Sequence, residues 1–326
     1  MVHDIIFLCL GLGLVLAGAN FLTDGASAIA RRFHLSELII GMTIVAFGSC
    51  TPDLVISLTS TLHGKAAMAV GDILGSNIFG ILLIVGICAL VRPIVIGRST
   101  LQKEFPLVVL SSAVLFVMAC DVLVDGSKDN IINRSDGLIL LFFFIINCYV
   151  TYKIAKSPDT SSESAGNSAA PDKKLKMWLA AVMVAAGLAG LVVGGNWFVD
   201  SATGIAAKCG MSESLIGLTI VAIGSSLPDL FTSVVAAARG HSDIALGNVV
   251  GSCIINIFFI IGVCSTVEPL ELGTINWIDF AVLVGGSLLL WVVGWVWGKR
   301  TIKRPEGAML VLCYIGYIAY LILSSK

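Results

Sequence analysis

A gapless internal duplication constrains this chain more than any other feature of its sequence. Residues 17–93 align with residues 193–269 at a constant offset of 176 positions, and about 30 of the aligned pairs are identical. The string GSCTPDL at 48–54 returns as GSSLPDL at 224–230, and GDILGSNIFGI at 71–81 returns as GNVVGSCIINI at 247–257. Hydrophobic composition alone does not produce that agreement, so the two halves of the chain are expected to share one fold.

The composition places this fold in a lipid bilayer. Hydrophobic residues make up 57% of the chain and charged residues 13%, about half the charged share of a soluble domain. Apolar runs of about 20 residues, the length that spans a bilayer, recur throughout. We therefore predict an all-α polytopic membrane protein of about ten transmembrane helices, near residues 4–30, 37–62, 67–91, 104–121, 136–155, 175–206, 213–238, 243–267, 277–298 and 306–324. No basic residue precedes the first run, which favours a retained helix over a cleaved signal peptide.

The basic residues predict the orientation of these helices. If the loops are numbered in order, 15 of the 20 Lys and Arg residues fall in the odd-numbered loops. The positive-inside rule makes those loops cytoplasmic, so both termini are expected on the outer, periplasmic face of a cell inner membrane. A polar segment at 156–174, rich in Ser, Ala and Pro, is predicted to be a cytoplasmic linker between a first half at 1–155 and a second half at 175–326.

The number of spans before the second copy fixes how the copies are related. Five spans precede it, an odd number, so the two copies enter the membrane in opposite directions. Inverted repeats of this kind are the architecture of secondary transporters, which bind substrate near the bilayer midplane between the repeats.

Each copy carries a proline and an aspartate in the middle of an apolar span. Proline lacks an N–H group and its ring clashes with the carbonyl four residues back, so both motifs predict a broken helix. Carbonyls without donors are tolerated inside a membrane only where protein, water or an ion satisfies them. The helix-breaking positions are Gly48, Pro52, Gly224 and Pro228, and the carbonyls expected to lose their donors include those of Ala46 and Ala222.

Oxygen-bearing side chains line one face of these helices. Ser49, Asp53 and Ser57 are spaced four residues apart and therefore lie on one stripe of a helix. The pattern returns in the second copy, and a second stripe follows in the next helix of each half: Ser225, Asp229 and Ser233; Asp72, Ser76 and Gly80; Asn248, Ser252 and Asn256. Carboxylate, hydroxyl and carbonyl oxygens suit Ca²⁺ or Na⁺ rather than a soft metal.

Other classes of protein fit the sequence less well. The nine cysteines are scattered without a CxxC pair or a Cys/His cluster, so neither a disulfide framework nor a zinc site is expected. The net charge of −1 and the absence of a basic patch give no sign of a nucleic-acid partner, and no obligate protein partner or cofactor is indicated. An intramembrane aspartyl protease with Asp53 and Asp229 as a proton-sharing pair stays open as an alternative, as does a passive cation channel. A protease does not need an inverted duplication, and rates that saturate with substrate and depend on a counter-ion would exclude a channel.

The paired motifs resemble the α-repeats of the cation/Ca²⁺ exchanger superfamily, and are most similar to the bacterial and archaeal sodium/calcium exchanger-like membrane proteins. The resemblance covers essentially the whole chain and implies an antiporter, not an enzyme. It implies ten helices, with ions bound between the second, third, seventh and eighth while the first and sixth slide to alternate access. By position, it assigns the acidic Ca²⁺ ligands to Asp53 and Asp229. The remaining ion ligands that it implies are Ser49, Ser225, Ser226, Ser76, Ser252, Ala46 and Ala222, with midplane positions at Gly80 and Asn256.

The sequence departs from the family at informative positions. Relatives usually carry Glu at both acidic positions, where this chain has Asp, and Cys50 replaces a hydroxyl residue. Hydroxyl residues still flank both acids, and Na⁺ needs several oxygens whereas a proton needs only a carboxylate. We therefore expect exchange of Ca²⁺ for Na⁺, with exchange for H⁺ as the alternative. Asn256 stands where potassium-dependent relatives typically have Asp, so no K⁺ requirement is expected.

Overall fold

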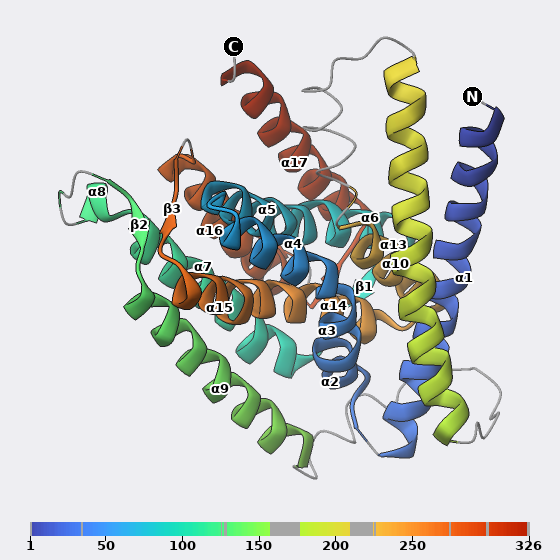
Figure 1. The fold of residues 1–326 in the computed structure, drawn as a ribbon. Helices are drawn as coiled ribbons and strands as arrows, with labels where there is room; N and C mark the ends of the chain where they lie inside the picture. The colour runs from blue at the N-terminus through green and yellow to red at the C-terminus, as the bar shows by residue number, and fades with distance from the viewer. Residues whose placement is uncertain are drawn as a thin grey trace.

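The predicted multi-pass helical architecture is confirmed. A computed structural model describes residues 2–33, 35–124, 126, 129–156, 177–208, 224, 226–273, 275–297 and 300–324 (Figure 1). In this part of the chain, eight helices are long and apolar enough to cross a membrane, and a bent helix pair brings the total to nine. The remaining expected span, 213–238, is described continuously only from Ser226 onward, so the predicted count of ten rests partly on residues outside the description.

The described elements of the two halves follow a similar order, except that a π-helical turn precedes α7 in the first half and follows α16 in the second. The first half contains α1 (Val2–Arg32), α2 (Glu37–Ile40), η1 (Gly41–Val45), α3 (Ala46–Ser49), α4 (Thr51–Leu62), α5 (Ala66–Ile78), η2 (Phe79–Ile84), α6 (Val85–Val91), β1 (Ile94–Val95), η3 (Thr100–Glu104), α7 (Phe105–Ala119), α8 (Asp121–Val124), β2 (Ile131–Ile132) and α9 (Arg134–Lys156). The second half contains α10 (Met177–Lys208), α13 (Leu227–Arg239), α14 (Ser242–Ile254), η6 (Ile255–Ile261), α15 (Gly262–Val267), β3 (Leu270–Glu271), α16 (Trp277–Val292), η7 (Val293–Trp297), β4 (Thr301–Ile302) and α17 (Arg304–Ser324). The segments labelled η are single π-helical turns within longer helices.

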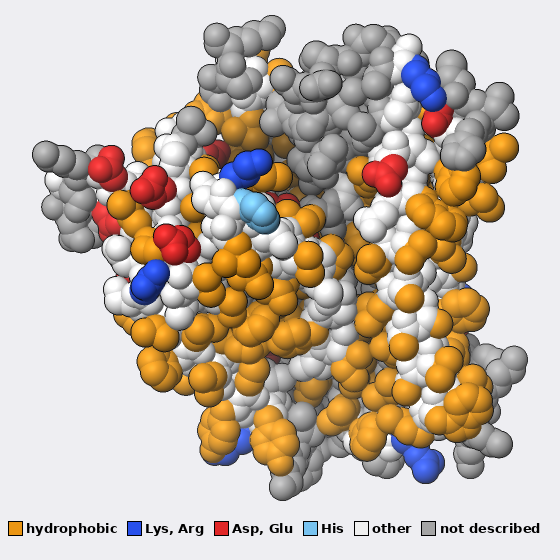
Figure 2. Space-filling model, in the orientation of Figure 1, with side chains coloured by type: hydrophobic (Ala, Val, Ile, Leu, Met, Phe, Trp, Pro, Cys, Tyr) orange, Lys and Arg blue, Asp and Glu red, His pale blue; other side chains and the backbone are white. Residues whose placement is uncertain are grey.

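Burial identifies the centre of the bundle. In the span Ser242–Val267, 94% of the most apolar window is buried, and in Ala66–Val91 the share is 72%. The spans of α9 and α17 are only 11% buried and lie at the periphery (Figure 1). Hydrophobic side chains cover much of the face in Figure 2, with most charged side chains toward its margins, as expected for a surface that contacts lipid. The motif-bearing helices therefore form the interior, and the outer helices shield them from lipid.

Two short antiparallel strand pairs, which the sequence pattern did not predict, connect the halves. Ile94 of β1 pairs with Ile302 of β4, and Ile132 of β2 pairs with Leu270 of β3. β1 and β3 are related by the repeat, because 94 plus 176 is 270. In each half, the strand after the third span thus pairs with the strand before the last span of the other half. This exchange is what a two-fold relation between inverted repeats produces.

Glycine contacts follow the same exchange. A Cβ atom at Gly18 of α1 would lie 2.8 Å from the carbonyl oxygen of Gly187 in α10, and one at Gly11 would lie 2.8 Å from that of Gly194. The repeat relates Gly11 to Gly187 and Gly18 to Gly194, since both differences are 176. Small residues let membrane helices approach closely when water supplies no hydrophobic driving force. Glycine pairing therefore holds α1 and α10 side by side along their length (Figure 1).

Gly18→Ala is expected to weaken the packing of α1 against α10, because its Cβ would meet backbone atoms closer than 3.0 Å. Gly13→Ala is the matched control, since a Cβ there meets nothing within 4 Å and the residue is exposed. Thermal unfolding in detergent should show a lower midpoint for Gly18→Ala and an unchanged or slightly higher midpoint for Gly13→Ala. Equal midpoints for the two variants would contradict this account of the interface.

Candidate ion-binding site

The predicted break in the first motif is confirmed. Helix α3 ends at Ser49, α4 begins at Thr51, and the two halves of the span are bent by 46° at Cys50. Pro52 occupies the first turn of α4, a position that tolerates proline because the first N–H groups of a helix have no partner within that helix. In the second motif Pro228 occupies the same position in α13, which begins at Leu227.

The break brings each aspartate to the start of a helix. Asp53 lies in the first turn of α4 and Asp229 in the first turn of α13. Free N–H groups and the helix dipole stabilise negative charge at that end. The repeated Pro-Asp sequence therefore places both carboxylates where the backbone favours an anion, one in each half.

One expectation about the break is wrong. The Ala46 carbonyl does not lose its donor, because the N–H of Cys50 donates to it at 2.9 Å. Pro52 removes only its own N–H, whose acceptor would have been Gly48, and leaves the donor at Cys50 in place. The Ser49 hydroxyl also lies 3.2 Å from the Ala46 oxygen. Whether this carbonyl binds an ion stays a prediction, and Ala222 and Ser225 lie outside the described residues.

Asp53 is buried without a normal hydrogen bond. The residue is 1% exposed, and neither carboxylate oxygen has a hydrogen-bond partner among the described residues. Ser76 and Asn256 lie close enough to interact with it, and the Asp72 and Asp229 carboxylates are the charged groups that act on it. A buried carboxylate in this situation costs free energy until a cation or a proton neutralises it.

Asp229 is instead held by an amide. Its side chain is 6% exposed, and Asn248 Nδ2 lies 3.2 Å from Asp229 Oδ1 and 3.0 Å from Ser233 Oγ. The Ser49 hydroxyl donates to Asn248 Oδ1 at 3.1 Å. Asn248 therefore joins the broken helix of the first half to the acid of the second half.

Two further bonds cross between the halves. Ser226 Oγ donates to Ser76 Oγ at 3.1 Å, and Asn256 Nδ2 donates to Asn77 Oδ1 at 3.1 Å. The predicted residues Ser49, Asp53, Ser76, Ser226, Asp229 and Asn256 thus belong to one buried polar region between α3, α4, α5, α13, α14 and η6. Ser252 is also buried, and its hydroxyl donates to the carbonyl of Val249 in its own helix at 3.0 Å.

The motif search missed two buried polar side chains of these helices, Asn77 and Thr232. The Nδ2 atom of Asn77 and the hydroxyl of Thr232 have no hydrogen-bond partner among the described residues. The repeat aligns Asn77 with Cys253 and Thr232 with Ile56, so a search for duplicated polar positions passes over both. A lone polar residue in an apolar helix was the signal available for each.

Among the described ion pairs, none joins a basic side chain to Asp53 or Asp229. The described ion pairs lie elsewhere: Arg134 with Glu268, Lys208 with Asp4, Arg239 with Asp24 and His241 with Glu37. No cluster of three or more His, Cys, Asp or Glu side chains with metal-binding geometry occurs in the described chain. A bound ion would therefore take its oxygens from carboxylates together with hydroxyl, amide and carbonyl groups, which is the donor set of Ca²⁺ and Na⁺.

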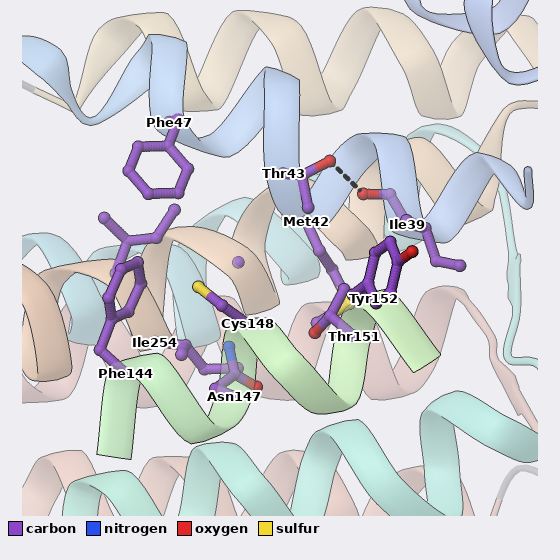
Figure 3. A pocket seen from close by; sticks show the side chains of 12 residues that line it. Ile39, Met42, Thr43, Phe47, Phe144, Asn147, Cys148, Thr151, Tyr152 and Ile254 are labelled. Carbon is purple, nitrogen blue, oxygen red and sulfur yellow. Dashed lines mark hydrogen bonds between the residues drawn. The ribbon is translucent and has the colours of Figure 1, made fainter. Parts of the chain in front are cut away.

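A separate cavity of about 250 Å³ lies between η1, α9 and α14 (Figure 3). Its wall is largely apolar, with Phe47 and Phe144 at one end and Tyr152 at the other. None of the candidate ion ligands lines it, so it is distinct from the polar region around Asp53 and Asp229.

A broken helix, a two-fold exchange between halves and buried acids without basic partners among the described residues define a membrane transporter built from repeats. The sodium/calcium exchanger protein family model matches residues 3–153 and 179–323, and the chain belongs to that family. The family is one of transporters, so the protease alternative is not supported.

Individual relatives agree along the whole chain. The Escherichia coli inner membrane protein YrbG is 35% identical, with 96% of this chain and 94% of that protein covered. The sodium/calcium exchanger MaX1 of Methanosarcina acetivorans is 29% identical, with 98% of each chain covered. The fold is similar to that of the sodium-calcium exchanger NCX_Mj in a structure soaked with zero Na⁺ and Ca²⁺, with a TM-score of 0.82, 30% identity, and 98% of this chain and 99% of that chain covered.

Ser49→Ala is expected to destabilise the protein, because Asn248 Oδ1 would lose its donor while it stays buried, at a cost of about 1–3 kcal/mol. Thr51→Ala is the control: its hydroxyl is exposed and donates to the carbonyl of Phe47 in the same half, with no bond to a buried side chain of the other half among those described. Denaturation in detergent without added Ca²⁺ would measure the difference. An unchanged free energy of unfolding for Ser49→Ala would show that this bond contributes little.

Proposed function

We propose that this protein is a secondary active antiporter that exchanges Ca²⁺ for Na⁺ across the membrane by alternating access. The observation that carries the proposal is the pair of buried acids, Asp53 and Asp229, one from each half and neither paired with a basic side chain in the described structure. Two carboxylates balance the charge of one Ca²⁺. The similarity to NCX_Mj and MaX1, both named as sodium/calcium exchangers, supports the same substrates.

The contacts of α1 support a moving part. At one end of α1, Asp24 pairs with Arg239 of α13 at 2.5 Å, and Ser27 lies 3.4 Å from His241 Nδ1. His241 in turn lies 3.0 Å from Glu37 at the start of α2. These polar contacts between α1 and the central helices can break and re-form without exposing a hydrophobic core. We propose that α1 and α10 slide together across the central helices, with the glycine pairs keeping them in contact.

The placement in the cell is part of the proposal. We place the protein in the cell inner membrane with both termini outside and the central linker in the cytoplasm, on the distribution of Lys and Arg. The relative YrbG is named as an inner membrane protein, which supports this location.

Asp53→Asn and Asp229→Asn are each expected to abolish Ca²⁺ transport, because each removes one of the negative charges that balance Ca²⁺. Asn has nearly the same shape as Asp, so both variants should still fold and insert. Uptake of ⁴⁵Ca²⁺ into proteoliposomes measures the effect, and size-exclusion chromatography in detergent checks the fold. Near-normal uptake by either variant would remove that residue from the proposed ligands.

Sodium is the proposed counter-ion, since hydroxyl groups flank both acids and Na⁺ requires several oxygens. We expect ⁴⁵Ca²⁺ uptake into Na⁺-loaded proteoliposomes with the pH gradient abolished by an ionophore, and the same uptake when K⁺ is omitted. With several Na⁺ exchanged for one Ca²⁺, uptake should also respond to an imposed membrane potential. Uptake that needs a pH gradient and ignores Na⁺ would instead favour the proton antiporter.

A further inference from the structure

The two halves differ at one position next to their acids. Asp72 of α5 corresponds to Asn248 of α14, because 72 plus 176 is 248. In the second half the amide of Asn248 lies within hydrogen-bond distance of Asp229 and partly compensates its charge. An ionised aspartate has no hydrogen to donate, so Asp72 cannot do the same for Asp53.

The structure shows the consequence at Asp53. Both of its oxygens lack a hydrogen-bond partner among the described residues, whereas Asp229 Oδ1 has the Asn248 amide. The repeat places Asp72 beside Asp53 as it places Asn248 beside Asp229, and the Asp72 and Asp53 carboxylates lie close enough for their charges to interact. Oδ2 of Asp72 is itself shielded from solvent. Asp53 is buried and Asp72 is half-buried, and neighbouring carboxylates shielded from water repel each other unless a positive charge lies between or beside them.

Unpartnered oxygens surround this pair. Ser57 lies one turn after Asp53 on α4, is fully buried, and its hydroxyl has no hydrogen-bond partner in the described chain. Asn256 is 1% exposed and lies near Asp53, and its Oδ1 atom has none either, because its Nδ2 atom makes the bond to Asn77. Neutral oxygens beside two carboxylates are the environment that a hard divalent cation requires.

We propose that Asp72 is a cation ligand, and that Asp53 and Asp72 together bind the divalent cation on the first-half side of the site. This inference rests on the proposed function, in which Ca²⁺ is a substrate, and adds a second carboxylate in the first half, beside Asp53. The second half, where Asn248 compensates Asp229, contributes less charge. The site is therefore electrostatically asymmetric, although the repeats that build it are equivalent in fold.

Asp72→Asn tests the proposal, because it gives the first half the residue that the second half already accommodates. We expect the Ca²⁺ concentration for half-maximal thermal stabilisation in detergent, and that for half-maximal ⁴⁵Ca²⁺ uptake, to rise at least about tenfold. Asp72→Glu keeps the carboxylate and should retain more of the Ca²⁺ affinity than Asp72→Asn. Glu271→Gln is the matched control, since it removes one charge from an exposed side chain of β3 and should leave both concentrations unchanged.

The outcomes separate this inference from the proposed function. If Asp72→Asn leaves both Ca²⁺ concentrations within about twofold of the wild type while Asp53→Asn raises them, Asp72 is not a ligand and the antiporter proposal stands. If the wild type neither binds nor transports Ca²⁺, both proposals fail. If Asp72→Asn does not fold, Asp72→Glu decides: an altered order of preference among Mg²⁺, Ca²⁺ and Sr²⁺ supports the ligand role, and an unchanged order overturns it.

Discussion

Burial of two carboxylates away from any described basic side chain is the constraint on which the rest of this structure depends. A charge in the interior of a membrane protein is costly unless a partner or a helix terminus stabilises it. Asp53 and Asp229 both lie in the first turn of a helix, and Pro52 and Pro228 allow those helices to begin there. Helices that ran through both positions would place the acids in mid-helix, away from the positive end of a helix dipole.

The surrounding bundle has to protect this site and still allow movement. The span around α14 is almost entirely buried, and α9 and α17 lie between the interior and the lipid. These two outer helices make equivalent contacts with the opposite halves: Gly86 of α6 packs against Gly307 of α17, and Gly262 of α15 packs against Gly137 of α9. At both contacts the missing Cβ atoms let the two helices approach closely.

The sequence predicted what duplication and hydrophobicity encode. The spans, the break at Pro52 and the gathering of Ser49, Ser76, Ser226 and Asn256 with the two acids all follow from patterns that occur twice or extend over about 20 residues. Features that depend on which partners meet in space were missed. The Asn77–Asn256 bond arises from packing between segments that no sequence spacing relates. The Ala46 carbonyl keeps the Cys50 N–H as its donor, because Pro52 removes only its own N–H group. The short strand pairs were missed because two residues give no periodicity.

Departures from two-fold symmetry fall on the polar lining, while the packing stays symmetric. The strand pairs and the glycine contacts occur in equivalent positions of the two halves. The polar lining does not, because the repeat aligns Asp72 with Asn248 and Gly80 with Asn256. In an inverted repeat, the two access states are related by exchange of the halves, so symmetric packing keeps their free energies similar. Both access states use the same ion site, so the free energies of the two states can be similar even when the ligands of that site are not symmetric. Unequal charges in the two halves can therefore determine which cation binds without favouring either access state through the packing.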